Sequence, residues 1–145
     1  MIITREALKE DYPAIYSLMI NELGYPDLDE NETLKRLESF RKNNDVATFV
    51  AVLDGTVAGF IGVGKVVSYE MDGDNAQILA LAVSENARRM GVGTALVKCI
   101  EGWSFAHGMK SIIVNTNEIR HDAHAFYENC GYRKYKVSYR FVKNL

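Results

Sequence analysis

Apolar and polar positions along this chain follow two periods, and the period changes from block to block. Short apolar runs bounded by turn residues are typical of strands, and apolar positions that recur every three or four residues are typical of amphipathic helices. The pattern predicts helices at 11–23, 29–42, 94–107 and 121–130. It predicts strands at 2–5, 46–53, 56–68, 77–83, 111–116 and 132–145. The order is therefore β-α-α-β-β-β-α-β-α-β, which indicates an α/β fold.

Turn and capping residues mark several of these boundaries. Asp54-Gly55 is typical of a tight hairpin turn, and Asp29 followed by Glu32 is typical of a capped helix start. Three glycines interrupt the strand predicted at 56–68 and indicate a bulge or a close backbone approach: Gly59, Gly62 and Gly64. The last block alternates apolar and polar residues, which predicts a half-exposed terminal strand.

The segment from 81 to 94 carries the first candidate chemistry. It reads as a buried strand, a short polar loop and a glycine turn that opens a helix. Gly91 and Gly93 permit unusual backbone angles and leave a ligand room, and a helix N-terminus favours anions. Arg88 and Arg89 add positive charge that suits phosphate oxygens. The segment therefore predicts a pyrophosphate-binding turn, although it matches neither a Walker loop nor a dinucleotide-binding fingerprint.

The pattern Arg88-x-x-Gly91-x-Gly93 after a strand ending in Leu-x-Val resembles the acetyl-CoA motif of the GNAT (N-acetyltransferase) superfamily. A second motif, at 120–132, resembles the last helix of that family, Ala-x-x-Phe-Tyr-Glu-x-x-Gly-Tyr. Two positions depart from the family pattern: Arg89 replaces the usual glycine, and Arg120 replaces a common asparagine. The second departure resembles the aminoglycoside 6′-N-acetyltransferase-like branch. Together the motifs cover residues 77–132.

The resemblance implies a fold, a cofactor and a catalytic residue. Residues 1–145 are expected to form a single N-acetyltransferase domain with a mixed β-sheet flanked by helices. Acetyl-CoA is expected as acetyl donor, with its binding residues Leu81, Ala82, Val83, Arg88, Arg89, Met90, Gly91, Val92, Gly93, Thr94 and Arg120. The backbone of 81–83 is expected to pair with the pantetheine arm and to offer an N–H to the acetyl oxygen.

By the resemblance, Tyr127 is expected to be the general acid that protonates the departing thiolate. A phenol of pKa about 10 suits this role because it stays protonated at neutral pH. The alternative is a core tyrosine, because Tyr127 lies on the apolar stripe of its helix.

Acidic and aromatic residues between the first two predicted helices indicate the acceptor. By the resemblance, Glu22, Tyr25 and Asp27 are expected to contact a cationic amine. The segment 68–74 has the same acidic character, and the two segments favour such an amine if they border one cleft. The general base stays open among Glu22, Asp27, Glu70, Asp72 and a water relay, and ordinary solvated acids are the alternative for all four.

Composition and charge limit the partners, metal sites and cellular locations that we expect. The 145-residue chain has a formal net charge of −2, which does not favour nucleic acid as a partner. Cys99 and Cys130 have no metal-ligand spacing, so we expect buried thiols and no metal. No signal or membrane-spanning pattern is present in the sequence, and we expect a cytoplasmic protein. The alternating terminal strand predicts a homodimer.

Three functions therefore stay open. The first is an N-acetyltransferase that acts on a small cationic amine such as an aminoglycoside or a polyamine. The second is a protein N-terminal or lysine acetyltransferase. The third, from another class, is a non-catalytic CoA-binding sensor module, which would have no need for an acid such as Tyr127.

Overall fold

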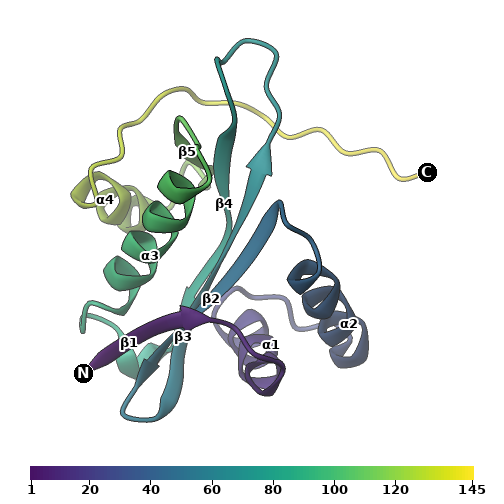
Figure 1. Cartoon of the computed structure of the whole chain (residues 1–145), viewed down its shortest axis with the longest axis vertical. Coiled ribbons are helices and arrows are strands. Elements are labelled where there is room, and N and C mark those ends of the chain that lie inside the picture. The colour runs from purple at the N-terminus through teal and green to yellow at the C-terminus, as the bar shows by residue number, and fades with distance from the viewer. The chain divides into compact units, whose positions relative to one another are not determined.

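Five strands form one sheet in the order β1-β2-β3-β4-β5 in the computed structural model, which describes residues 1–145 (Figure 1). Their bounds are β1 Ile2–Glu6, β2 Val46–Leu53, β3 Thr56–Val66, β4 Asn75–Val83 and β5 Ile112–Val114. The first four strands pair antiparallel, and β5 pairs parallel with β4. The predicted mixed sheet is confirmed.

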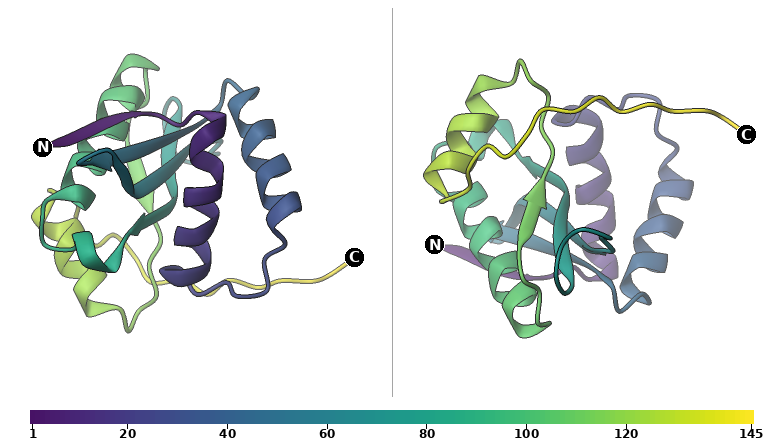
Figure 2. Two further views of the ribbon diagram at one scale, coloured as in Figure 1. Left: turned by 90° about the horizontal axis from the view of Figure 1, so that it is seen from below. Right: turned by 90° about the horizontal axis from the view of Figure 1, so that it is seen from above.

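Helices cover both faces of this sheet (Figure 2). The short 3-10 turn η1 (Lys9–Asp11), α1 (Tyr12–Asn21) and α2 (Glu30–Arg41) lie on one face. The 3-10 turn η2 (Glu85–Ala87) leads into α3 (Val92–Ala106), which lies on the other face. The core under α1 and α2 is a buried apolar cluster: Ala7, Tyr12, Ile15, Leu18, Leu37, Val50, Phe60 and Ala82. Helix α3 buries Leu96, Val97 and Ile100. The predicted α/β class is thus confirmed.

The chain divides into two units, Met1–Val114 and Asn115–Leu145. The first holds the sheet and three helices. The second holds α4 (His121–Asn129) and the residues that follow it. Our expectation of a single domain over 1–145 stays a prediction.

The order of elements agrees with the sequence pattern from β1 to α4, but the strand predicted at 132–145 is absent. These residues carry no regular secondary structure, and their apolar side chains are exposed, with Tyr139 at 89% and Phe141 at 93%. Alternation gives a segment one apolar face, but a strand also needs a neighbouring backbone to accept its N–H groups. The prediction of a strand at 132–145 was wrong because an alternating pattern does not show whether a second strand is available to pair with it.

Three local features that the sequence predicted are present in the structure: a hairpin turn, a helix cap and a close backbone approach. Asp54 and Gly55 both have positive φ, 50° and 83°, as a two-residue hairpin of type I′ requires. The Asp29 side chain accepts a hydrogen bond from the Glu32 N–H at 2.9 Å and caps α2. A side chain at Gly59 would bring its Cβ within 2.8 Å of the Ala82 carbonyl oxygen and 3.1 Å of Val92. The predicted close approach is confirmed there, and it lets α3 lie tightly on the sheet.

One buried carboxylate links the start of α1 to the first strand. Asp11 accepts hydrogen bonds from Arg5 at 2.6 and 3.0 Å and from the Leu8 N–H at 2.7 Å. The Arg5 hydrogen bond is the main cause that holds the pKa of Asp11 below its ordinary value, while burial opposes it.

We expect this pair to make the protein sensitive to acid. A carboxylate whose pKa is lowered on folding stabilises the fold above its unfolded pKa, about 3.9, and that stability is lost as pH falls through the folded pKa. Asp11→Asn is expected to lower the free energy of unfolding at pH 7 by about 1–3 kcal/mol, with a smaller loss below pH 4. Urea unfolding at both pH values checks this. The exposed control, Asp45→Asn, should change neither value, and equal losses for Asp11→Asn at both pH values would contradict the assignment.

Candidate functional site

The turn between β4 and α3 leaves a helix N-terminus open. Gly91 is the N-cap of α3 with φ 85°, and no side chain caps the helix. The Ala95 N–H donates to the Gly91 carbonyl at 3.0 Å, so the N–H groups of residues 92–94 precede the first intrahelical bond. Helix α3 has 15 residues, and its dipole adds partial positive charge at this end. The predicted phosphate-binding turn therefore has the geometry that an anion needs.

The left-handed backbone of this turn explains the residue types in the motif. Arg89 has φ 64°, and Gly91 has φ 85°. A residue with a Cβ pays about 1–2 kcal/mol in this conformation, so glycine is the natural choice at both positions. Arg89 stands where the family usually has glycine, and it keeps the glycine-like angle. Its exposed side chain adds a positive charge beside the turn.

Arg88 is held by a residue from a distant part of the chain. Its Nη2 donates to Oε2 of Glu22 at 2.6 Å, and Oε1 of Glu22 accepts the Glu85 N–H at 3.2 Å. The Glu22 side chain is only 14% exposed, and that of Arg88 is 57% exposed. The structure thus brings together Arg88, expected at the cofactor, and Glu22, expected at the acceptor. Sequence reasoning missed this pair because nothing local links residues 66 positions apart.

The sheet opens along one edge of β4. Strand β5 pairs only with Ala76, Gln77 and Ile78, so Leu79 to Val83 have no strand on that side. On the other side Leu81, Ala82 and Val83 pair with β3. These three residues therefore have no strand partner along one backbone edge, which is where the resemblance expects the pantetheine arm.

A β-bulge lies where the sheet opens. Gly62 is opposite Ala80 and Val63 is opposite Ile78, which leaves Leu79 without a partner on β3. The Leu79 side chain lies over Gly64, where an added Cβ would come within 2.9 Å of it, and it is 53% exposed. Bulges re-aim backbone groups and side chains and recur next to active sites. The glycine-rich β3 hinted at a bulge, but no signal in 77–83 placed it at Leu79.

In the second unit, the end of α4 explains the spacing of the second motif. Gly131 has φ 93°, its N–H donates to Glu128 at 3.0 Å, and the Tyr132 N–H donates to the Tyr127 carbonyl at 2.9 Å. This is a Schellman cap, which needs glycine after the helix and favours contact between the flanking side chains. The rings of Tyr127 and Tyr132 meet edge to face with centroids 5.8 Å apart. The Gly-Tyr pair therefore ends the helix and packs against Tyr127.

Tyr127 is half-buried, and burial is the main cause that raises its pKa above 10. Arg120, the N-cap of α4, lowers that pKa through its charge and only partly offsets burial. The phenol is therefore protonated at neutral pH, as a proton donor must be.

The acidic segments do not border one cleft along β4. The first begins at Glu22, beside Glu85 and so at the end of β4, whereas the second, at 68–74, precedes the start of β4. A strand of nine residues separates such ends by on the order of 26 Å. Tyr25 is 55% exposed, and Asp27 is exposed in the α1–α2 connection.

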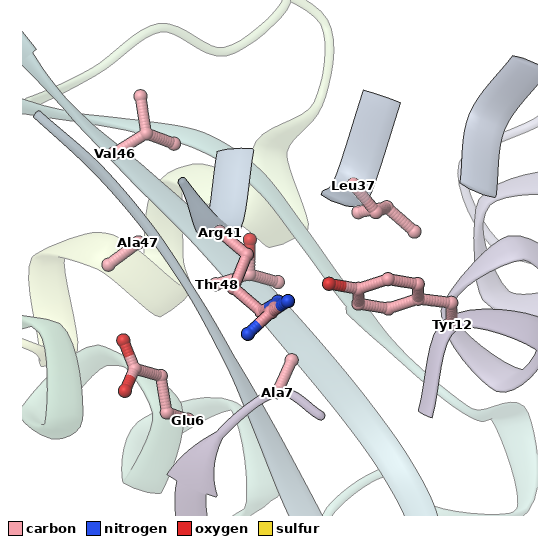
Figure 3. A pocket seen from close by; sticks show the side chains of 8 residues that line it. All are labelled: Glu6, Ala7, Tyr12, Leu37, Arg41, Val46, Ala47 and Thr48. Carbon is pink, nitrogen blue, oxygen red and sulfur yellow. The ribbon is translucent and has the colours of Figure 1, made fainter. Parts of the chain in front are cut away.

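A small cavity lies elsewhere, between the two N-terminal helices and the sheet (Figure 3). Its volume is about 20 Å³, which has room for a water molecule but not for a substrate. Tyr12 and Arg41 point toward each other across it, and the Tyr12 hydroxyl donates to Glu38 at 3.1 Å. None of the predicted site residues lines this cavity.

The family model described as the acetyltransferase (GNAT) family matches residues 6–132. The chain belongs to the GNAT family. It is thereby an acyltransferase of the N-acetyltransferase type, and the resemblance seen in the two motifs is confirmed.

Individual relatives agree with this family. The chain is 29% identical to an uncharacterized N-acetyltransferase of Methanocaldococcus jannaschii, over 88% of this chain and 85% of that protein. It is 28% identical to human N-acetylaspartate synthetase, over 65% of this chain but only 30% of that protein. Among solved structures, it superposes with TM-score 0.89 on AAC(6')-Iy in complex with a bisubstrate analog, CoA-S-monomethyl-acetylneamine. That match covers 100% of this chain and 99% of the other at 16% identity, and it shows the shared fold.

No helix in the structure combines the length and the apolar character that crossing a membrane requires. The cytoplasmic location expected from the sequence stays a prediction.

Proposed function

We propose that this GNAT chain transfers an acetyl group from acetyl-CoA to the primary amine of a small cationic molecule, by direct attack in a ternary complex. The observation that carries the proposal is the β4–α3 turn, which joins an uncapped helix N-terminus to a strand with one free edge. A pyrophosphate fits the first, and the amides of a pantetheine arm fit the second.

Acetyl-CoA is the acetyl donor. The N–H groups of Val92, Gly93 and Thr94 receive its pyrophosphate, with Arg88, Arg89 and Met90 beside them. The free edge at Leu81 to Val83 pairs with the pantetheine arm. Arg120 adds charge for the phosphates by the family resemblance. The complex of AAC(6')-Iy with a CoA-containing analog supports this ligand for the fold.

The reaction needs little covalent help from the protein. The neutral amine attacks the thioester carbonyl carbon, and a backbone N–H of β4 stabilises the oxyanion that forms. The carbon–sulfur bond then breaks, and Tyr127 gives its proton to the departing thiolate. The new amide nitrogen releases a proton to water, directly or through an acidic side chain, and the Tyr127 phenolate takes a proton back from solvent.

The acceptor is a small cation because the α1–α2 connection carries acidic and aromatic groups. Asp27 and Tyr25 are exposed there and offer charge and a ring face to an amine. Glu22 lies at the same connection, although its carboxylate is engaged by Arg88. The bisubstrate analog bound to AAC(6')-Iy, CoA-S-monomethyl-acetylneamine, supports this class of acceptor.

Initial rates of thiol release, measured with different acceptors at equal concentration, test the acceptor class. Aminoglycosides and polyamines are expected to support faster release than peptides with a free N-terminus or a lysine. Asp27→Asn should raise the KM for a cationic acceptor and leave the KM for acetyl-CoA unchanged. Faster release with peptides than with every small amine would make the chain a protein acetyltransferase instead.

Two copies associate through residues 132–145. This segment alternates exposed apolar side chains, including Tyr135 at 79% and Tyr139 at 89%, and β5 is an edge strand that pairs on one side only. An edge strand can accept a strand from a second copy.

Light scattering at micromolar concentration is expected to give the mass of a dimer, and removal of residues 133–145 is expected to give a monomer. A monomer mass for the full chain would contradict the association.

A further inference from the structure

We infer that Glu22 is a positioning residue for the phosphate-binding turn, holding Arg88 and the Glu85 N–H in the arrangement that receives the pyrophosphate of acetyl-CoA. This inference rests on the proposed function, and it adds a residue that neither family motif contains.

The position of Glu22 is the first support. Glu22 is the C-cap of α1, where the helix dipole leaves partial negative charge. A carboxylate is disfavoured at that end unless a cation compensates it. Arg88 supplies the cation at 2.6 Å, and the Glu22 side chain is largely buried. The hydrogen-bond partners of this largely buried carboxylate, the Glu85 N–H and the Arg88 guanidinium, both belong to the turn region.

The second support is that the two carboxylate oxygens hold two different parts of the turn. Oε1 accepts from the backbone of Glu85, which opens η2, and Oε2 accepts from the side chain of Arg88, which follows η2. Arg89 and Gly91, both with left-handed backbone angles, follow this anchored segment. Glu22 therefore holds in place the backbone of residues 85–88, which leads into the N-terminus of α3.

The third support is that the pair leaves Arg88 able to bind a phosphate. Glu22 engages one guanidinium nitrogen, and a guanidinium carries five N–H donors. Arg88 is 57% exposed and would otherwise lose more side-chain freedom on binding. With Glu22 in place, part of this ordering is done before the ligand arrives, which lowers the Kd.

Calorimetric titration of the full chain with CoA tests the inference. Glu22→Ala is expected to raise the Kd of CoA roughly tenfold and to change kcat at saturating acetyl-CoA by a much smaller factor, because loss of preorganisation weakens binding more than chemistry. Glu22→Gln is expected to give a smaller increase, because its amide oxygen still accepts the Glu85 N–H. The matched control is Glu38→Gln, which removes a comparable ion pair with Arg41 at 2.6 Å on α2 and should leave the Kd unchanged.

The exchanged variant, Glu22→Arg with Arg88→Glu, separates stability from ligand binding. Glu22→Ala is expected to lower the Tm because it breaks the ion pair with Arg88, and the exchanged variant is expected to restore the Tm. The exchanged variant should not restore the affinity for CoA, because a glutamate at position 88 would then face the pyrophosphate. An unchanged Kd in Glu22→Ala, or tighter binding in Glu22→Gln, would overturn the inference. A fall in kcat at constant Kd would overturn it too and would assign Glu22 as the general base. Wild-type chain that does not bind CoA would overturn the proposed function and this inference with it.

Discussion

Tyr127→Phe is expected to lower turnover by about 10²–10⁴-fold while the affinity for CoA stays nearly constant. Phenylalanine keeps the ring and its edge-to-face contact with Tyr132, so the substitution removes only the hydroxyl proton donor. Steady-state kinetics and CoA titration of the same preparation check the two halves of this expectation. Burial raises the pKa of Tyr127 above 10. Ionisation of Tyr127 should therefore cause no loss of activity at pH values well below 10.

Tyr132→Phe is the matched control. It keeps the ring that contacts Tyr127 and the backbone N–H that closes the α4 cap. Turnover is expected to change little. Full activity in Tyr127→Phe, or inactivity in Tyr132→Phe instead, would show that the acid is misassigned, and the acetyltransferase would then rely on water or backbone groups to stabilise the thiolate.

Gly91→Val is expected to weaken CoA binding at least tenfold. Valine is poorly suited to the left-handed angle of Gly91, φ 85°, so the N-cap of α3 must shift and carry its N–H groups away from the phosphate. A tenfold change corresponds to about 1.4 kcal/mol, within the cost of one such strained residue. Calorimetric titration of the folded variant with CoA measures the change.

Gly102→Ala is its control on the same helix. Gly102 lies inside α3, its added Cβ would meet nothing within 4 Å, and alanine is the better helix former. The Kd of CoA is expected to stay the same while the Tm rises. Equal Kd values for wild type and Gly91→Val would mean that phosphates bind elsewhere.

The sequence predicted those parts of the fold that depend on interactions between residues close together in the chain. Helical periodicity placed α2 and α3 within a few residues, and Asp54-Gly55 placed its hairpin, because each signal acts within one turn of backbone. The glycine turn before α3 was also predictable, because few residues other than glycine accept the backbone angle that Gly91 adopts. That it binds phosphate stays a prediction.

The parts that the sequence did not predict depend on distant neighbours. The bulge at Leu79 follows from how β3 and β4 align, and an unbroken apolar run gives no sign of it. The Glu22–Arg88 pair joins a helix end to a loop 66 residues away. The strand expected at 132–145 needed a partner backbone that alternation alone does not provide.

The most direct test of the account follows acetyl-CoA and an amine through one reaction. Purified chain is incubated with acetyl-CoA and the small cationic amine that gives the fastest thiol release, and free CoA and acetylated amine are quantified together by mass spectrometry. The account predicts that both products appear in equal amounts and that both fall together in Tyr127→Phe. Binding of acetyl-CoA with neither product, for any amine tried, would contradict it and would indicate a CoA sensor rather than an enzyme.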